Sequence, residues 1–208
     1  MERLKKACRD WPTPVAAALA RSGNPFQLLV STLLSLRTRD ADMERAYGKL
    51  IQKVATPEQL LGLSSRELEK ILYPIPFYKT KAKTLKTLCR DLVDRFEGKV
   101  PGTMEELLSL KGVGRKTANL VHTLGFGGKG ICVDTHVHRI CNRWGYVETA
   151  TPDQTEAALR DKLPTKYWKK FNEHLVAFGQ NICKPISPIC SQCCVEEFCE
   201  KWGVKKRR

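Results

Sequence analysis

Residues 107–119 read LLSLKGVGRKTAN. Leucines at helical spacing lead into two glycines, and Gly112 and Gly114 allow backbone angles or close approaches that other residues resist. The stretch therefore predicts two helices joined by a tight turn. Such a turn exposes backbone N–H groups at the start of the second helix, a site suited to a phosphate, and Lys111 and Arg115 add charge to it. A plain glycine connection between helices explains the same pattern, and both interpretations stay open.

Lys116 falls in the first turn of that second helix. The positive end of the helix dipole and the neighbouring Arg115 both disfavour its ammonium form. A neutral amine is a nucleophile, so the position suits covalent catalysis. Solvation or a phosphate contact is the commoner role of such a lysine, and the residue alone does not decide between them.

Asp134 stands in CVDTHVHR, residues 132–139, with apolar Val133 and Val137 around it. The pattern predicts that Asp134 opens another helix and caps its N-terminus. The alternative is a metal site made of Asp134, His136 and His138. A helix disfavours this alternative, because residues two apart do not face each other on it.

Four cysteines lie near the C-terminus, with six, two and five residues between them: Cys183, Cys190, Cys193 and Cys199. The spacing predicts four thiolates at one metal or iron–sulfur centre rather than a disulfide framework, and nine cysteines in all indicate a reducing compartment. The spacing matches no ferredoxin pattern, so zinc and iron–sulfur both remain open. Cys194 as the third ligand would change the last spacing from five to four.

The rest of the chain predicts helices and no strand, so the fold class is all-α. Helix starts are indicated by Asn24 with Pro25, by Ser64 with Glu67, and by Thr151 with Pro152 and Gln154. Longer helices are expected at residues 78–97 and 166–180. In the first of these, leucines form the inner face and five basic residues are expected mostly outside: Lys79, Lys81, Lys83, Lys86 and Arg90.

The 208-residue chain carries a net charge of +14, from 36 Lys and Arg against 22 Asp and Glu. This excess favours nucleic acid as the partner, although a solvated basic surface or tail gives the same balance. The longest uncharged stretch, residues 22–36, is too short and too polar to cross a bilayer. We therefore expect a soluble cytoplasmic protein without a membrane partner, and a monomer, since no coiled-coil seam is visible.

Three motifs together resemble the endonuclease III family of DNA glycosylases: residues 110–119, the VDTH of residues 133–136, and the four-cysteine tail. The likeness begins at residues 26–40 and ends at Cys199. It implies an all-α helix–hairpin–helix protein with two helical lobes and a DNA groove between them. Residues 24–132 would form a helical barrel, with the hairpin at about 103–125. Residues 1–23 and 133–208 would hold a [4Fe–4S] cluster on the four cysteines, in the loop 183–199.

The resemblance also implies an activity, which is excision of oxidised pyrimidines from duplex DNA as a bifunctional glycosylase and AP lyase. Lys116 matches the nucleophilic lysine of the family and Asp134 its catalytic aspartate. The lysine would form a Schiff base with the sugar, and β-elimination would then cut the strand. The expected partner is double-stranded DNA with damaged pyrimidines or abasic sites, which places the protein at the nucleoid.

Further DNA contacts follow from the same resemblance. Arg37 occupies the position where the family usually has a glutamine, and it would enter the space of the extruded base. Phe77 aligns with an apolar wedge, although loop packing explains it equally well. The remaining DNA contacts implied are Lys111, Gly112, Val113, Gly114, Arg115 and His136.

Two functions compete with this one. The resemblance extends to monofunctional mismatch glycosylases of the same fold, but those relatives lack a lysine at the position that Lys116 occupies here. A non-catalytic helix–hairpin–helix DNA-binding protein with a structural four-cysteine metal site remains the alternative from another class.

Overall fold

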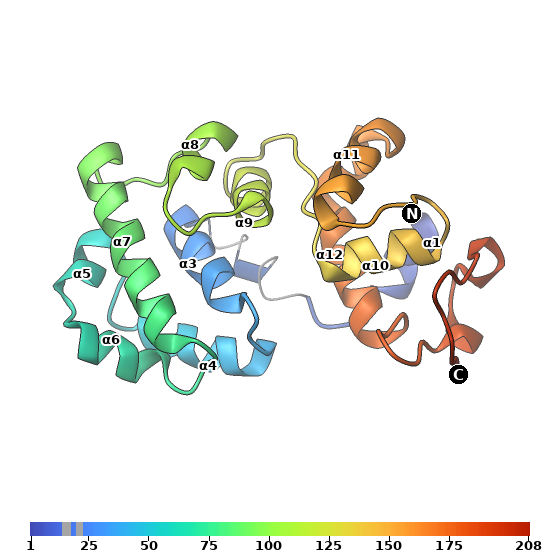
Figure 1. The fold of residues 1–208 in the computed structure, drawn as a ribbon, viewed down its shortest axis with the longest axis horizontal. Helices are drawn as coiled ribbons and strands as arrows, with labels where there is room; N and C mark the ends of the chain where they lie inside the picture. The colour runs from blue at the N-terminus through green and yellow to red at the C-terminus, as the bar shows by residue number, and fades with distance from the viewer. Residues whose placement is uncertain (14–17, 20–22) are drawn as a thin grey trace. The chain divides into compact units, whose positions relative to one another are not determined.

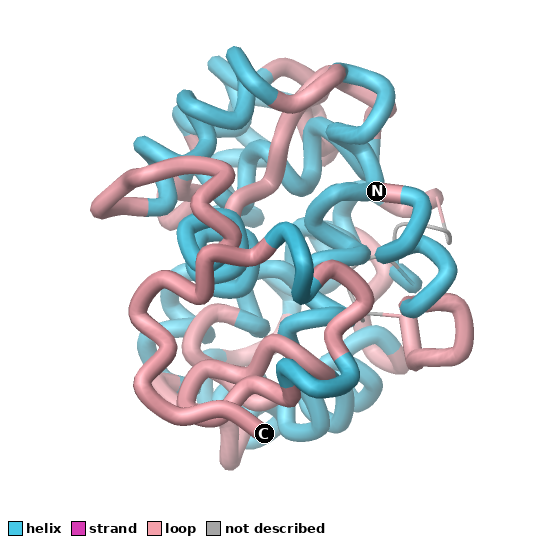
Figure 2. The backbone as a smooth tube through the Cα atoms, turned by 90° about the vertical axis from the view of Figure 1, so that its right-hand side faces the viewer, coloured by secondary structure: helices cyan, strands magenta, loops and turns pink. Residues whose placement is uncertain are grey.

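The structure is a computed structural model that describes residues 1–13, 18–19 and 23–208 of the chain. These residues form helices and loops and contain no strand, as Figure 2 shows. The all-α prediction is therefore confirmed for the described part of the chain. None of its helices combines the length and apolarity that a bilayer span requires.

The chain divides into two compact units. The central unit is Val15–Gly128, and the terminal unit combines Met1–Pro14 with Lys129–Arg208. Both ends of the chain thus contribute to one unit, while the middle of the chain forms the other.

The central unit is built around α7 (Tyr78–Phe96), its longest described helix, which packs against α3, α5 and α6 (Figure 1). Leucines of α7 and α3 are fully or almost fully buried, among them Leu88, Leu92 and Leu29. The described elements of this unit besides α7 are α3 (Pro25–Ser35), α4 (Asp40–Ile51), α5 (Pro57–Gly62), α6 (Ser65–Leu72), α8 (Met104–Ser109), α9 (Arg115–Leu120) and the π-helical turn η1 (Val121–Gly125).

Helix starts in this unit are set by local side chains, as predicted. The Asn24 side chain accepts hydrogen bonds from the N–H groups of Phe26 and Gln27 at 3.0 and 3.1 Å. Ser64 and Glu67 form a reciprocal capping box at the start of α6. Each such cap stabilises its helix by about 1 kcal/mol, because it satisfies N–H groups that have no partner within the helix.

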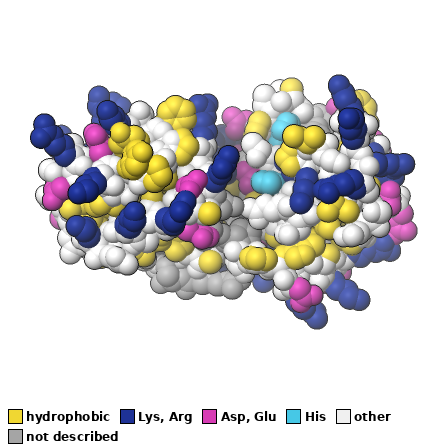
Figure 3. All heavy atoms as spheres, turned by 90° about the horizontal axis from the view of Figure 1, so that it is seen from below, with side chains coloured by type: hydrophobic (Ala, Val, Ile, Leu, Met, Phe, Trp, Pro, Cys, Tyr) yellow, Lys and Arg dark blue, Asp and Glu magenta, His cyan; other side chains and the backbone are white. Residues whose placement is uncertain are grey.

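The basic residues of α7 divide into two groups. Lys79, Lys83 and Arg90 are exposed, as predicted, and Lys and Arg side chains stand out on the face drawn in Figure 3. For Lys81 and Lys86 the prediction was wrong, because both are half-buried and their ammonium groups donate to backbone carbonyls. Long side chains of this kind can bury their stems while the charge reaches polar atoms.

The terminal unit packs α1 (Glu2–Ala7) and α10 (Thr135–Arg143) against α12 (Trp168–Asn181). Its core includes the fully buried Phe178, Leu175 and Ile140. Thr151 and Gln154 form the predicted capping box at the start of α11 (Pro152–Lys162). The helix expected at 166–180 is α12, preceded by the short turn η2 (Thr165–Tyr167), and the cysteine region holds two more short turns, η3 (Cys190–Gln192) and η4 (Glu196–Phe198).

Candidate active site

The two-glycine turn joins α8 to α9 as the sequence predicts. Leu107, Leu110 and Val113 are buried beneath it, and the N–H of Val113 donates to the carbonyl of Leu110 at 3.1 Å. The Val113 side chain is 6% exposed, so this side chain anchors the turn in the core. Buried apolar side chains therefore fix the turn to the core of the central unit.

The two glycines serve different needs. Gly112 has φ 87°, and a Cβ placed on it would lie 2.4 Å from Cγ2 of Thr84 on α7. Only glycine accepts both the left-handed angle and that approach. Gly114 has an ordinary φ of −90° and occupies the N-cap position of α9, and no atom of the described residues would lie within 4 Å of a Cβ placed on it. Within the described part of the chain, the start of α9 is therefore open at Gly114, where a phosphate is expected to bind.

Three basic side chains surround this turn. Lys111, Arg115 and Lys116 are exposed, and Lys116 is the second residue of α9. The helix beneath them is firmly packed, since Ala118 is fully buried and Asn119 is 1% exposed. The backbone N–H of Lys111 donates to Oδ2 of Asp91 at 3.2 Å, which ties the turn to α7. Lys116 is accordingly an exposed amine on a rigid support within a positive patch.

Asp134 caps α10, as the sequence predicts. Its Oδ1 accepts hydrogen bonds from the N–H groups of His136 and Val137 at 2.8 and 2.9 Å. The residue is 9% exposed. Because both capping bonds go to Oδ1, the second carboxylate oxygen takes no part in the cap and can act in other chemistry.

The two histidines after Asp134 turn to different partners. Nδ1 of His136 lies 3.1 Å from Nη2 of Arg139, and Nδ1 of His138 lies 2.7 Å from Oγ1 of Thr155. Among the described residues, no group of three or more His, Cys, Asp or Glu side chains is arranged so that it could hold a metal ion. The alternative of a metal site on Asp134 and the two histidines is therefore not supported.

Two residues proposed from the resemblance as DNA contacts lie on tight turns. Arg37 is exposed between α3 and α4 and has φ 53°. Phe77 precedes α7 with φ 59°, and its side chain is 60% exposed. So exposed a phenyl ring is not explained by loop packing. Tyr73, which the sequence analysis did not single out, is 62% exposed and forms an edge-to-face contact with Tyr78 at 5.5 Å.

Sequence reasoning also missed Lys81. Its Nζ donates to the carbonyl of Leu34, at 2.8 Å, and to Oγ1 of Thr38. Burial lowers the pKa of Lys81 to about 8. A lysine on the apolar side of α7 was the signal available in the sequence, but its partners lie far away along the chain.

The four cysteines line one small cavity of the terminal unit. Cys183, Cys190, Cys193 and Cys199 surround a space of about 20 Å³ together with apolar side chains, and Cys194 is not among the residues that line it. Burial raises the pKa of the Cys193 thiol to about 11. A metal that binds such thiols must displace their protons.

The cysteine loop packs against the buried side chain of Arg143. Its guanidinium donates to the carbonyls of Lys184 and Pro185 at 2.7 and 2.5 Å and approaches Sγ of Cys183 at 3.5 Å. In return the carbonyl of Arg143 accepts from Sγ of Cys199 at 3.4 Å. Arg143 thus contacts both ends of the cysteine segment, the first through its side chain and the second through its backbone carbonyl.

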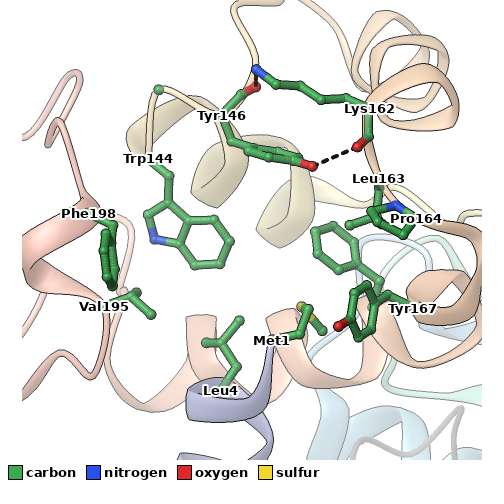
Figure 4. Close-up of a pocket in the computed structure, with 12 residues that line it drawn as sticks. Met1, Leu4, Trp144, Tyr146, Lys162, Leu163, Pro164, Tyr167, Val195 and Phe198 are labelled. Carbon is green, nitrogen blue, oxygen red and sulfur yellow. Dashed lines mark hydrogen bonds between the residues drawn. The ribbon is translucent and has the colours of Figure 1, made fainter.

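The terminal unit has a second, larger cavity of about 400 Å³, shown in Figure 4, which is lined mainly by apolar and aromatic side chains such as Trp144 and Tyr167. Lys162 and Tyr146 close one side of it. Lys162 Nζ donates to the Tyr146 carbonyl at 2.6 Å, and the Tyr146 hydroxyl donates to the Lys162 carbonyl at 3.0 Å. None of the site residues predicted from the sequence lines this cavity.

Comparison with known proteins places these features in a family. Residues 30–165 match the HhH-GPD superfamily of base excision DNA repair proteins. Endonuclease III of Thermotoga maritima is 45% identical over 177 residues, which cover 85% of this chain and 83% of that protein. Endonuclease III of Bacillus subtilis is 36% identical, covering 88% of this chain and 87% of that protein.

Comparison with solved structures leads to the same family. A trapped covalent intermediate of endonuclease III with DNA, an estranged-adenine complex, matches with a TM-score of 0.81 at 35% identity, covering 86% of this chain and 84% of that one. A thermostable thymine-DNA glycosylase matches with a TM-score of 0.77 at 28% identity, with the same coverage. The chain therefore belongs to the HhH-GPD superfamily of base excision DNA repair proteins, and within it to the endonuclease III family.

Proposed function

We propose that this chain is a bifunctional DNA glycosylase and AP lyase that excises oxidised pyrimidines from duplex DNA in base excision repair. The observation that carries the proposal is Lys116, an exposed amine in the first turn of α9, directly behind the two-glycine turn. A similar solved structure is a trapped covalent intermediate of endonuclease III with DNA. A covalent intermediate needs a nucleophile, and Lys116 is suited to be that group here.

In the proposed reaction, the neutral amine of Lys116 attacks C1′ of the damaged nucleotide, and the bond from C1′ to the base breaks. Asp134 stabilises positive charge on the sugar or takes the proton of the attacking amine. Its role is supported by the carboxylate oxygen that the helix cap leaves unused. The bond from C1′ to the ring oxygen then opens, which leaves a Schiff base between the amine and C1′. β-Elimination removes a proton from C2′ and breaks the bond from C3′ to the phosphate, which cuts the strand on the 3′ side of the lesion.

The base must leave the duplex before this attack, which costs a few kcal/mol and least for damaged bases that stack badly. We assign the filling of the vacated space to Phe77 and Arg37, which are both exposed on left-handed turns. The N–H groups near Gly112 and Gly114 are assigned to a DNA phosphate, supported by the open space at Gly114. His136 is assigned a DNA contact as well.

We further propose that the four cysteines hold a [4Fe–4S] cluster. The donor set fits, because all four thiols line one cavity. A tetrathiolate zinc ion would use the same four donors, and the choice of a [4Fe–4S] cluster rests on the likeness to the endonuclease III family. When bound, the cluster would supply a structural link between the two ends of the cysteine segment.

The cluster is tested by elemental analysis and visible absorption of protein purified without air. Iron and sulfide near four each per chain, with broad visible absorption, are expected from the cluster composition. Zinc in place of iron, in a colourless protein, would overturn the assignment.

The activity is tested by borohydride trapping on a duplex that contains thymine glycol. We expect a covalent adduct with the wild type and none with Lys116→Gln, which should still bind DNA. Lys111→Gln is the matched control, because it removes the same charge from the same turn. It should weaken binding but keep the adduct. Strand cleavage at the wild-type rate by Lys116→Gln would refute the role of Lys116, and no adduct with the wild type would favour a non-catalytic DNA-binding protein.

Asp134→Asn separates catalysis from folding. Asparagine caps helices as well as aspartate does, so the variant should keep α10 and its stability. Loss of the carboxylate should slow base removal by a factor of about 10² to 10⁴, the usual contribution of a positioned acid or base. An unchanged single-turnover rate would remove Asp134 from the mechanism.

We expect the protein to act as a monomer on the DNA of the nucleoid in the cytoplasm. Its charge of +14 supports binding to a polyanion. Analytical ultracentrifugation with and without a lesion-containing duplex tests this, and a stable dimer on DNA would contradict it.

A further inference from the structure

The C-terminal end of α3 is closed by a lysine that comes from a different helix. The last four carbonyls of a helix lack partners within it. In α3, the carbonyls of Thr32, Leu33 and Ser35 accept from nearby groups of the same segment. The remaining carbonyl, that of Leu34, accepts from Nζ of Lys81 on α7 at 2.8 Å.

The same ammonium group reaches the turn that carries Arg37. Lys81 also donates to Oγ1 of Thr38, and this hydroxyl donates to the carbonyl of Leu36 at 3.2 Å. Leu34 and Thr38, which lie on either side of Arg37, therefore both accept hydrogen bonds from the ammonium of Lys81. Arg37 itself has φ 53°, which costs a residue with a side chain roughly 1–2 kcal/mol. The conformation thus depends on its neighbours for support.

We propose that Lys81 is a positioning residue for base excision. It holds the turn between α3 and α4 in one conformation, in which the side chain of Arg37 points toward the bound DNA. The inference rests on the proposed function, in which Arg37 enters the space of the extruded base. In this proposal Lys81 acts through the turn, to which its ammonium donates two hydrogen bonds within the protein.

The cost of burying this charge supports a specific role. Burial lowers the pKa of Lys81 to about 8, so the protonated form is disfavoured at this place. A methionine would fill similar space without a charge. The half-buried ammonium of Lys81 donates to Leu34 and Thr38 and so favours one backbone geometry, whereas a methionine makes neither hydrogen bond.

Lys86 provides a natural control on the same helix. Its Nζ donates to the carbonyls of Leu61, at 3.0 Å, and Leu63, so it closes the end of α5 in the same way. No residue assigned to DNA lies on that turn. Lys81→Met and Lys86→Met therefore remove the same kind of contact, but only the first releases the turn of Arg37.

The experiment measures single-turnover excision of thymine glycol placed opposite each of the four bases, for Lys81→Met, Lys86→Met and Arg37→Ala. We expect Lys81→Met to lose about tenfold or more in rate, since small displacements of a positioned group cost up to about a hundredfold. It should also show the opposite-base preference of Arg37→Ala. Adding Lys81→Met to Arg37→Ala should cause no further loss, because the two changes remove one function. Lys86→Met should keep the wild-type preference.

Several outcomes overturn the inference. Lys81→Met with the wild-type rate and preference does so, and so does an effect of Lys86→Met on preference as large as that of Lys81→Met. If Lys81→Met does not fold, Thr38→Val removes one partner of the same cation, and an unchanged preference in that variant counts against the inference.

A separate assay keeps this result apart from the proposed function. Borohydride trapping on an abasic duplex depends on Lys116 and not on Arg37, so Lys81→Met should form the adduct as the wild type does. Failure of the wild type to form it would refute the proposed function itself. Trapping by the wild type, together with full excision by Arg37→Ala, would refute only the role of Arg37 and, with it, that of Lys81.

Discussion

Replacing Gly112 with alanine should destabilise the central unit through two contributions, one from the backbone conformation and one from side-chain packing. The left-handed φ of 87° costs a residue with a Cβ roughly 1–2 kcal/mol. The new Cβ would also lie 2.4 Å from Cγ2 of Thr84, and overpacking of this kind costs about 1–3 kcal/mol. We therefore expect a loss of about 3 kcal/mol, a large part of the typical stability of about 5–15 kcal/mol.

A double-mutant cycle separates the two contributions. Thr84→Ser removes the methyl group that the new Cβ would strike, so the Gly112→Ala, Thr84→Ser protein should recover the packing part of the loss. The backbone part of roughly 1–2 kcal/mol should remain. Gly114→Ala is the control. Its position has an ordinary φ and open space around it, so only the poorer cap matters, at about 1 kcal/mol or less.

The assay is unfolding by urea, followed by far-UV circular dichroism, with binding to an abasic duplex measured in parallel. Gly112→Ala should lower both stability and affinity, since the turn must shift away from α7. The reasoning fails if Gly112→Ala is as stable as the wild type. It also fails if Thr84→Ser rescues none of the loss, because the contact with Cγ2 would then not be the cause.

Three further predictions concern charge and the cysteine loop. The pKa of Lys81 is about 8 when folded and 10.5 ordinarily, so between these values the unfolded chain holds a proton that the folded chain has lost. The unfolding free energy of the wild type, relative to Lys81→Met, should therefore rise from pH 8 to pH 10.5, and a fall measured in urea titrations would contradict the burial of the ammonium. Cys190→Ser should lower folded yield and visible absorption, and an equally stable, equally coloured product would count against a structural cluster. DNA affinity should fall linearly with salt on logarithmic axes, because phosphate contacts release counterions; Lys111→Gln should reduce the slope by about one unit, and an unchanged slope would exclude a phosphate contact.

Helix starts were predictable because their causes lie within three residues of one another. Asn24, Ser64, Thr151 and Asp134 each accept hydrogen bonds from N–H groups two or three positions further along the chain. Such contacts are present in the sequence as spacing alone. The two-glycine turn was predictable for the same reason, although the need for glycine at position 112 comes partly from Thr84 on another helix.

The side chains of α7 show which features of burial the local sequence pattern does not predict. Periodicity predicted its buried leucines, but Lys81 and Lys86 were expected to lie mostly outside, as Lys79 does. Their direction depends on carbonyls at the ends of α3 and α5, which only the packed unit brings within reach. The exposure of Phe77 was undecided for a similar reason, because a loop residue is buried only if another element covers it.

By itself, the sequence determined the all-α class, the helix starts, the two-glycine turn with Lys116 behind it, and a four-cysteine set, since each follows from residue type and short-range spacing. The tertiary structure alone decided which cations turn inward, that the four cysteines share one cavity without Cys194, and that Arg143 supports both ends of their segment. These features join residues far apart along the chain, and hydrogen bonds of a few ångströms exist only after packing has brought such residues together.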